Sequence, residues 1–199
     1  GTLDDNWRPS FLEASKYYVE QEKPIILDPV GSGASKLRTQ TCLDIINDSK
    51  KLIIRGNASE ILALQGEETE AKGVDSQEEV ETALNASKKL AKKHNCTIFV
   101  TGEIDIITDG VRVTRVSGGS SFMSSVTAIG CSLTCLVGAF TAITDPYTAS
   151  VSAATLFAEA GHKAKLSANG PGSFRMHFID QLSLANPHNF SNLKWADSV

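Results

Sequence analysis

The chain has 199 residues and a net charge of −4, and 41% of its residues are hydrophobic. This composition is typical of a single globular domain, and its acidic balance excludes a general affinity for nucleic acid. No apolar run is long enough to span a bilayer, and no signal or transit pattern opens the sequence. The four cysteines have neither CxxC nor zinc-ligand spacing, so we expect reduced thiols in a cytoplasmic protein.

Apolar periodicity predicts helices that alternate with short buried strands through the first half of the chain. The first helix is expected to be capped by Asp5-Asn6, with Pro9 in its first turn. The predicted helices cover about 7–20, 39–47, 61–64 and 77–95, and the predicted strands cover 25–27, 52–54 and 97–100.

The second half begins with a predicted hairpin, in which 104–108 and 111–116 flank a type I′ turn at Asp109-Gly110. A loop then leads into a long apolar helix. Asp145-Pro146 is expected to cap a further helix that runs to Ala168. A last short helix is predicted around 174–182.

Three buried strands alternating with helices predict a parallel sheet in an α/β layered fold. In such a sheet, residues that follow the strands gather at one edge, where open α/β sheets bind their ligands. Asp28 follows the first strand and precedes a glycine-rich loop, although it is equally suited to capping its own turn. Arg55, whose planar fork suits phosphate, and Glu60, a possible magnesium ligand, follow the second strand; the alternative is an ordinary helix-entry turn.

The stretch 126–133, Val-Thr-Ala-Ile-Gly-Cys-Ser-Leu, is a second candidate for a phosphate site. A loop of small residues that feeds a helix presents free N–H groups and the positive end of the helix dipole. Cys131 lies at the entry of that helix, where a thiolate is favoured. The alternative is an ordinary loop followed by a core helix with a buried cysteine.

Six motifs occur in the order seen in hydroxyethylthiazole kinases, and the chain resembles that family from Gly1 to about Leu184. They are Leu27 to Ala34, Ile54 to Ile61, Lys72 to Ser76, Thr101 to Asp105, Gly130-Cys131 and Gly170 to Phe174. The Ala-Ile-Gly-Cys form of the central loop resembles the kinase half of a fungal bifunctional enzyme, in which a thiamine-phosphate synthase precedes the kinase.

The resemblance implies a ribokinase-like layered fold, with a mainly parallel central sheet flanked by helices, plus a β-hairpin. It implies transfer of a phosphoryl group from ATP to the hydroxyl of 4-methyl-5-(2-hydroxyethyl)thiazole in thiamine biosynthesis. It also implies a homo-oligomer, a trimer or a multiple of one, with the site between subunits.

The resemblance assigns roles to individual residues. Asp28 and Glu60 serve the Mg²⁺, and Cys131 and Asp28 are the catalytic pair, with Cys131 orienting the hydroxyl or accepting its proton. The nucleotide and its phosphates are assigned to Arg55, Asn57, Thr101, Thr127 and Gly130. The thiazole alcohol is assigned to Gly1, Pro29, Val30 and Ala128.

Two departures from the family pattern bear on activity. Ala128-Ile129 stand where the family usually has Gly-Thr or Gly-Ala, and the Ala128 methyl is expected to oppose a positive φ. The family's N-terminal third has no counterpart, so the 199 residues are expected to form one kinase-like domain that lacks its N-terminal part, with an incomplete pocket and an unpaired sheet edge. A kinase of another small alcohol and a non-catalytic trimer-forming module are the alternatives.

Overall fold

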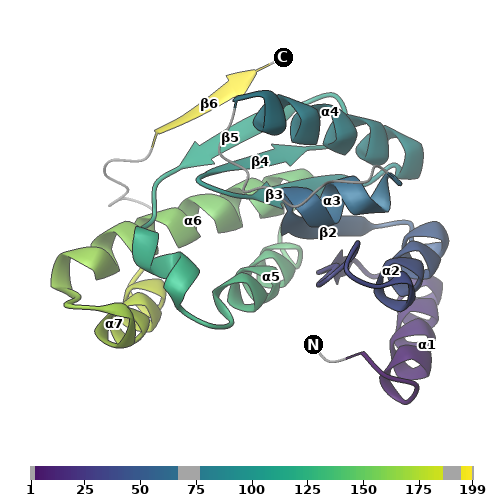
Figure 1. Cartoon of the computed structure of the whole chain (residues 1–199), viewed down its shortest axis with the longest axis horizontal. Coiled ribbons are helices and arrows are strands. Elements are labelled where there is room, and N and C mark those ends of the chain that lie inside the picture. Colours follow the sequence, from purple (N-terminus) through teal and green to yellow (C-terminus); the bar gives the residue numbers. More distant parts are fainter. Residues whose placement is uncertain (1–2, 67–76, 186–193, 199) are drawn as a thin grey trace.

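A mixed six-stranded sheet with the order β1-β2-β3-β4-β5-β6 lies at the centre of the computed structural model, which describes residues 3–66, 77–185 and 194–198 (Figure 1). The strands are β1 (Ile25–Leu27), β2 (Leu52–Asn57), β3 (Thr97–Thr101), β4 (Ile104–Thr108), β5 (Val113–Ser117) and β6 (Lys194–Ser198). The first three strands are parallel, as predicted, whereas the pairs from β3 to β6 are antiparallel. The sheet is therefore mixed. Its antiparallel part contains β6 in addition to the two strands of the predicted hairpin.

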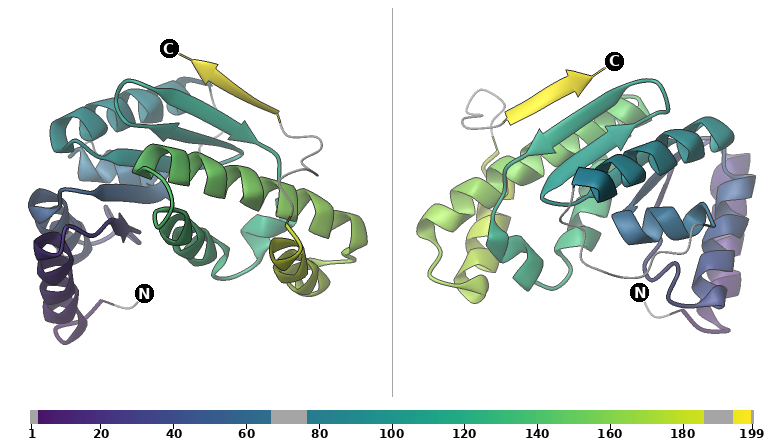
Figure 2. Two further views of the ribbon diagram at one scale, coloured as in Figure 1. Left: turned by 180° about the vertical axis from the view of Figure 1, so that it is seen from behind. Right: turned by 45° about the horizontal axis from the view of Figure 1, so that its top comes forward.

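Helices cover both faces of this sheet (Figure 2). They are α1 (Trp7–Glu20), α2 (Lys36–Asp48), α3 (Ala58–Leu64), α4 (Gln77–His94), α5 (Ile129–Phe140), α6 (Pro146–Ser167) and α7 (Pro171–Ser183), with a 3₁₀ turn η1 (Ser121–Ser125). Helices α2, α3 and α4 share a core with one face, and α5, α6 and α7 share a core with the other. Helix α1 packs against α2.

The strands separate these two cores because successive side chains point to opposite faces. Ile54 and Ile98 are fully buried on the α3–α4 side, while Ile53 and Phe99 are fully buried on the α5–α6 side. Burial on both faces explains why the strands are continuous apolar runs rather than alternating ones. Among the described residues, β1 is the terminal strand and pairs only with β2.

Local caps follow the sequence at some helices and differ at others. Asp145 caps α6 as predicted, accepting hydrogen bonds from two backbone N–H groups, and Pro146 is the first helical residue. At α1 the N-cap residue is Asn6, within the predicted pair, but its side chain makes no cap hydrogen bond, and the Asp4 carboxylate accepts from the N–H groups of Asn6 and Trp7 instead. None of the helices in the described ranges combines the length and hydropathy needed to cross a bilayer.

The β4–β5 turn also differs from its prediction. Thr108 pairs with Val113, so four residues rather than two connect the strands. Only Gly110 among them has a positive φ, of +92°, whereas a type I′ turn needs two such residues. The Asp109 carboxylate accepts hydrogen bonds from the N–H groups of Val111 and Arg112, which stabilises the wider loop.

Candidate active site

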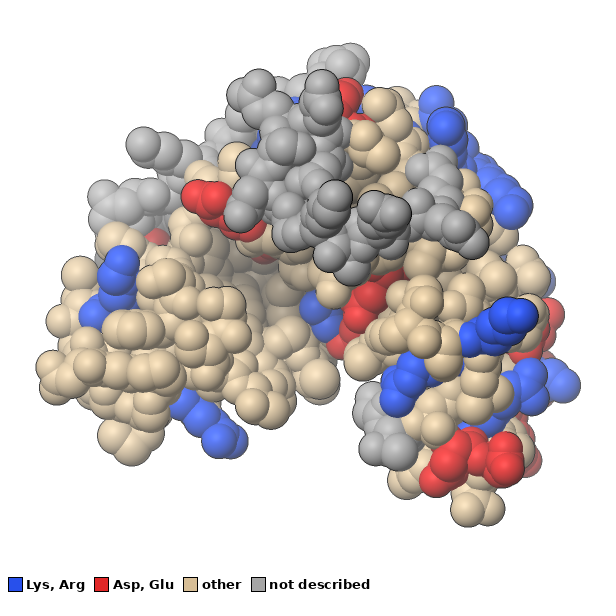
Figure 3. Space-filling model, viewed as in Figure 1, with Lys and Arg blue, Asp and Glu red and all other residues tan. Residues whose placement is uncertain are grey.

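The carboxyl ends of the parallel strands bring Asp28, Arg55 and Thr101 to one edge of the sheet. Asp28 directly follows β1, Arg55 lies within β2, and Thr101 ends β3. Thr101 also donates a hydrogen bond from its hydroxyl to the Gly56 carbonyl at 3.3 Å, which ties β3 to β2. Figure 3 shows a hollow on this face of the molecule, with basic and acidic atoms side by side within it.

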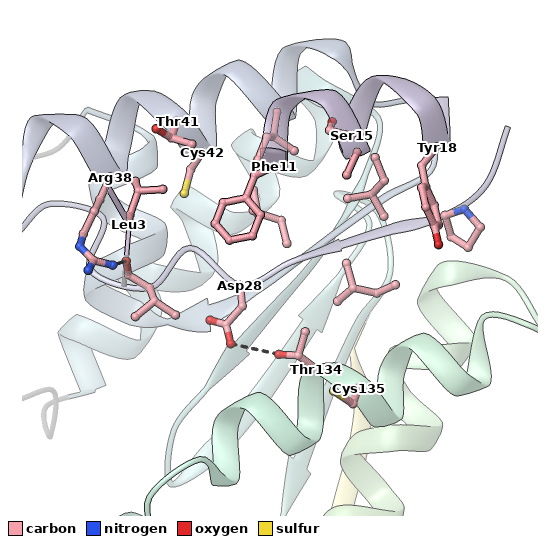
Figure 4. A pocket seen from close by; sticks show the side chains of 17 residues that line it. Leu3, Phe11, Ser15, Tyr18, Asp28, Arg38, Thr41, Cys42, Thr134 and Cys135 are labelled. Carbon is pink, nitrogen blue, oxygen red and sulfur yellow. Dashed lines mark hydrogen bonds between the residues drawn. The ribbon is translucent and has the colours of Figure 1, made fainter. Parts of the chain in front are cut away.

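Arg55 and Asp28 form a buried ion pair through Nη2 and Oδ2, and their side chains are only 8% and 15% exposed. Thr134, on α5, completes the group. Its hydroxyl accepts a hydrogen bond from Arg55 Nε at 3.0 Å and lies 3.1 Å from Asp28 Oδ2, to which it donates (Figure 4). The three side chains come from the residue after β1, from β2 and from α5, so this network fixes the helix against the strand ends.

Glu60 and Asn57 form a capping box at the start of α3. Asn57 accepts a hydrogen bond from the Glu60 N–H at 2.9 Å, and Glu60 Oε2 accepts one from the Asn57 N–H at 3.0 Å. The other carboxylate oxygen accepts from the Gly31 N–H at 3.0 Å, so Glu60 also holds the glycine-rich loop after β1. The ordinary helix-entry turn weighed for this stretch is therefore present, and it positions that loop.

The start of α5 has the backbone geometry of an anion site. Ala128 is its N-cap residue and adopts the left-handed conformation, with φ of +69°. The sequence predicts that the Ala128 methyl group opposes a positive φ, yet the chain adopts this conformation. The first hydrogen bond of the helix joins the Ser132 N–H to the Ala128 carbonyl. The N–H groups of Ile129, Gly130 and Cys131 therefore have no carbonyl acceptor within the helix.

Gly130 packs directly against the guanidinium of Arg55. A Cβ atom at this position would lie 3.0 Å from Nη1 and 3.2 Å from Nη2 of Arg55. A larger residue at position 130 would collide with the guanidinium. Glycine therefore allows the N-terminus of α5 to contact the cationic side chain of Arg55.

The thiols of α5 face solvent. Cys131 and Cys135 are both exposed, and the helix buries only Leu133 and Val137. The alternative of a core helix with a buried cysteine is therefore wrong for this helix, although its sequence is apolar throughout. Exposure leaves Cys131 accessible to a ligand at the helix N-terminus.

A cavity of about 900 Å³ lies between the β3–β4 turn, the start of α5 and helix α6. Arg55, Thr101, Ala128 and Gly130 line it, so four of the predicted site residues share this space. Its size and its mixture of backbone N–H groups and cationic side chains suit a nucleotide.

A second cavity of about 520 Å³ lies between α1, α2, β1 and α5 (Figure 4). Its wall is mostly apolar, with Phe11 and Tyr18 from α1. Asp28 and Thr134 provide polar atoms at its floor. Since Arg55 lines the first cavity and is bonded to both of these residues, the Asp28–Arg55–Thr134 network is a wall common to the two cavities.

Asp105 is a site residue to which the sequence assigns no role. It lines the 900 Å³ cavity and accepts a hydrogen bond from the Gly102 N–H at 3.0 Å. Burial raises the pKa of Asp105 to about 7, against the opposing influence of that hydrogen bond and of Arg55. The nucleotide-sized cavity therefore contains a carboxyl group whose ionised form is disfavoured by burial.

Most of the remaining predicted residues line neither cavity. Pro29 is buried in contact range of Gly56, and Thr127 and Asn57 are exposed on the surface. Val30 lines the smaller, apolar cavity, and Gly1 lies outside the described residues. The assigned roles of these residues stay predictions.

The predicted metal ligands are two carboxylates, and both accept hydrogen bonds from the protein. Within the described ranges no three His, Cys, Asp or Glu side chains cluster as a metal cage. Mg²⁺ usually binds one or two carboxylates together with substrate phosphates and water. Asp28 lines the smaller cavity and suits that mode of binding, whereas Glu60 lines neither cavity and both of its carboxylate oxygens accept backbone N–H groups, so the metal roles of the two residues stay predictions.

Comparisons with known proteins agree with this geometry. A family model described as the hydroxyethylthiazole kinase family matches residues 1–187. A hydroxyethylthiazole kinase of Gemmatimonas aurantiaca is 46% identical over 187 residues, which are 94% of this chain and 67% of the relative.

Solved structures give the same picture. The structure of a hydroxyethylthiazole kinase protein from Pyrococcus horikoshii has a TM-score of 0.87 at 36% identity, covering 98% of this chain and 74% of that one. A Staphylococcus aureus pyridoxal kinase in complex with AMP-PCP has a TM-score of 0.65 at 16% identity, covering 100% of this chain and 71% of that one. The likeness confirms the ribokinase-like fold expected from the sequence.

Proposed function

Because the chain belongs to the hydroxyethylthiazole kinase family, we propose that it transfers the terminal phosphoryl group of ATP to the hydroxyl of 4-methyl-5-(2-hydroxyethyl)thiazole. The observation that carries the proposal is the wall common to the two cavities. A nucleotide-sized cavity and an apolar cavity meet at a buried Arg–Asp pair. Phosphoryl transfer needs a donor and an acceptor held in line, with cationic groups between them.

In this proposal ATP occupies the 900 Å³ cavity, with its terminal phosphate against Arg55 and the start of α5. Positioning and charge neutralisation account for most of the catalysis of phosphoryl transfer. The guanidinium and the free N–H groups of Ile129, Gly130 and Cys131 supply both at one point. The exposed Cys131 thiol is suited to orienting the acceptor hydroxyl or accepting its proton late in the transfer.

The apolar cavity suits the thiazole ring, since Phe11 and Tyr18 offer aromatic surface and Asp28 offers an acceptor for the hydroxyl. Asp28 and Glu60 would hold Mg²⁺ together with the nucleotide's phosphates, and the ion would neutralise charge on those phosphates. A trimer, a fused thiamine-phosphate synthase domain and a cytoplasmic location belong to the same proposal and rest on the family resemblance.

A non-catalytic assembly module is the main alternative. It is disfavoured because assembly alone requires no buried Arg–Asp pair between two cavities. A kinase of another small alcohol, such as a hydroxymethylpyrimidine, is the alternative among enzymes.

The test is turnover by the full chain, whose intact mass is measured first. Incubation with ATP, Mg²⁺ and the thiazole alcohol should give ADP and a thiazole phosphate ester in equal amounts, detected by ³¹P NMR. Parallel incubations without alcohol and with a hydroxymethylpyrimidine should give far less ADP. Nucleotide binding without transfer to either alcohol would favour the assembly module, and transfer to the pyrimidine alone would favour the other kinase.

A further inference from the structure

We propose that Thr134 is a positioning residue for the phosphoryl transfer, holding Arg55 by one edge so that the opposite edge faces the nucleotide. The inference rests on the proposed function and adds to it a residue on α5, Thr134, to which the sequence assigns no role. Its basis is the pattern of hydrogen bonds around the guanidinium.

The three side chains close a ring. Arg55 Nε donates to Thr134 Oγ1, the Thr134 hydroxyl donates to Asp28 Oδ2, and Arg55 Nη2 donates to the same Asp28 oxygen. The Thr134 hydroxyl also lies 3.3 Å from the Gly130 carbonyl, but it carries one proton, and the ionised carboxylate at 3.1 Å is the stronger acceptor.

The hydrogen bonds of the ring involve the edge of the guanidinium formed by Nε and Nη2, and they do not involve Nη1. Among the described residues, Nη1 has no hydrogen-bond partner, and it lies beside Gly130 at the start of α5. Arg55 lines the 900 Å³ cavity although its side chain is 8% exposed. A buried guanidinium fixed through Nε and Nη2 can therefore offer Nη1 to an anion in that cavity.

A carboxylate alone does not fix this orientation. An ion pair through a single nitrogen allows the planar fork to turn about its contact, whereas two contacts through Nε and Nη2 define its plane. Thr134 supplies the second contact, and its hydroxyl is itself held by the hydrogen bond that it donates to Asp28 Oδ2. We therefore expect its hydroxyl, rather than its bulk, to carry the effect.

Three variants separate the hydroxyl from the bulk. Thr134→Val keeps the shape and removes the hydroxyl, whereas Thr134→Ser keeps the hydroxyl. Thr141→Val is the matched control, because the Thr141 hydroxyl at the end of the same helix donates only to the Gly138 carbonyl. Kinetic constants, the Kd of ADP and the Arg Nε–H signals in ¹⁵N NMR spectra are measured for each, with Arg55→Lys identifying the Arg55 signal.

Thr134→Val should lower kcat/KM by about 10- to 100-fold, the loss expected for one hydrogen bond to a charged group. It should weaken ADP binding and speed exchange of the Arg55 Nε–H with water by at least about tenfold. Thr134→Ser and Thr141→Val should stay within about threefold of the wild type in all three measurements.

Two results would overturn the inference: a Thr134→Val protein that behaves like the wild type, or a Thr134→Ser protein as impaired as Thr134→Val. The Nε–H exchange rate and the Kd of ADP need no turnover. A wild-type chain that fails to phosphorylate the thiazole alcohol would therefore refute the proposed function and still leave these two measurements to decide the role of Thr134.

Discussion

Replacing Asp105 with Asn should stabilise the protein at alkaline pH, and the size of the effect follows from its pKa. The pKa of this carboxyl rises from an ordinary 3.8 to about 7, mainly through burial. Its ionised form is therefore less stable in the folded protein than in the unfolded chain. The difference between the two pKa values lowers the unfolding free energy by up to about 4 kcal/mol at a pH where the carboxyl is ionised in both the folded and the unfolded state. Water that reaches the partly exposed carboxyl reduces this limit, so we expect a gain of about 1–3 kcal/mol.

The pH dependence has a defined sign. With the folded pKa above the unfolded one, the wild type has its full stability from this group below about pH 4 and loses it as the pH rises to about 7. Asn cannot ionise, yet it still accepts the Gly102 N–H. Urea unfolding of both proteins should therefore show a large gain in unfolding free energy near pH 8 and a smaller one near pH 5.

Asp109→Asn is a control of opposite sign. Burial acts against ionisation of Asp109, but hydrogen bonds from the Arg112 side chain and from the backbone N–H groups of Val111 and Arg112 outweigh it, so its pKa is lowered. Removing this charge should destabilise the protein at pH 8 and have less effect as the pH falls through the lowered pKa. If Asp105→Asn gave no gain at pH 8, or a gain of equal size at pH 5, the account of Asp105 as a buried, disfavoured carboxylate would be refuted.

Three further changes test the start and the surroundings of α5. Ala128→Gly should raise the unfolding free energy by about 1 kcal/mol in urea melts, because glycine adopts φ of +69° without strain; a loss of stability would contradict this. Gly130→Ala should weaken ADP binding at least about tenfold in calorimetry, since its methyl would lie 3.0 Å from Arg55 Nη1; unchanged affinity would show that the guanidinium moves freely. Asp145→Ala should lower the unfolding free energy by about 1 kcal/mol through loss of the α6 cap, with kcat unchanged; an unchanged melt would show that the cap contributes nothing.

The meeting of Asp28 and Arg55 was predictable because it follows from strand topology. Apolar runs identify buried strands, and parallel strands place their carboxyl ends at one edge. The free N–H groups at the start of α5 were likewise predictable, because a loop of small residues leads into an apolar helix there.

Other features depend on tertiary contacts that the sequence does not encode locally. Thr134 lies 106 residues from Asp28 along the chain, and a threonine within an apolar helix usually bonds the preceding turn. The exposure of Cys131 reflects how little of α5 the fold covers, which its apolar sequence conceals. The raised pKa of Asp105 arises from the burial of its carboxyl on β4, and a hairpin pattern carries no sign of that burial.

Because the two cavities have a common wall, binding in one cavity is thermodynamically coupled to binding in the other. A ligand that shifts Arg55 in the larger cavity changes the partner of Asp28 in the smaller one, and the reverse also holds. Linkage then requires that the factor by which the alcohol alters the Kd of the nucleotide equal the factor by which the nucleotide alters the Kd of the alcohol. Neither affinity is a property of one cavity alone, so a substitution in either cavity that moves this ion pair changes the binding of both substrates.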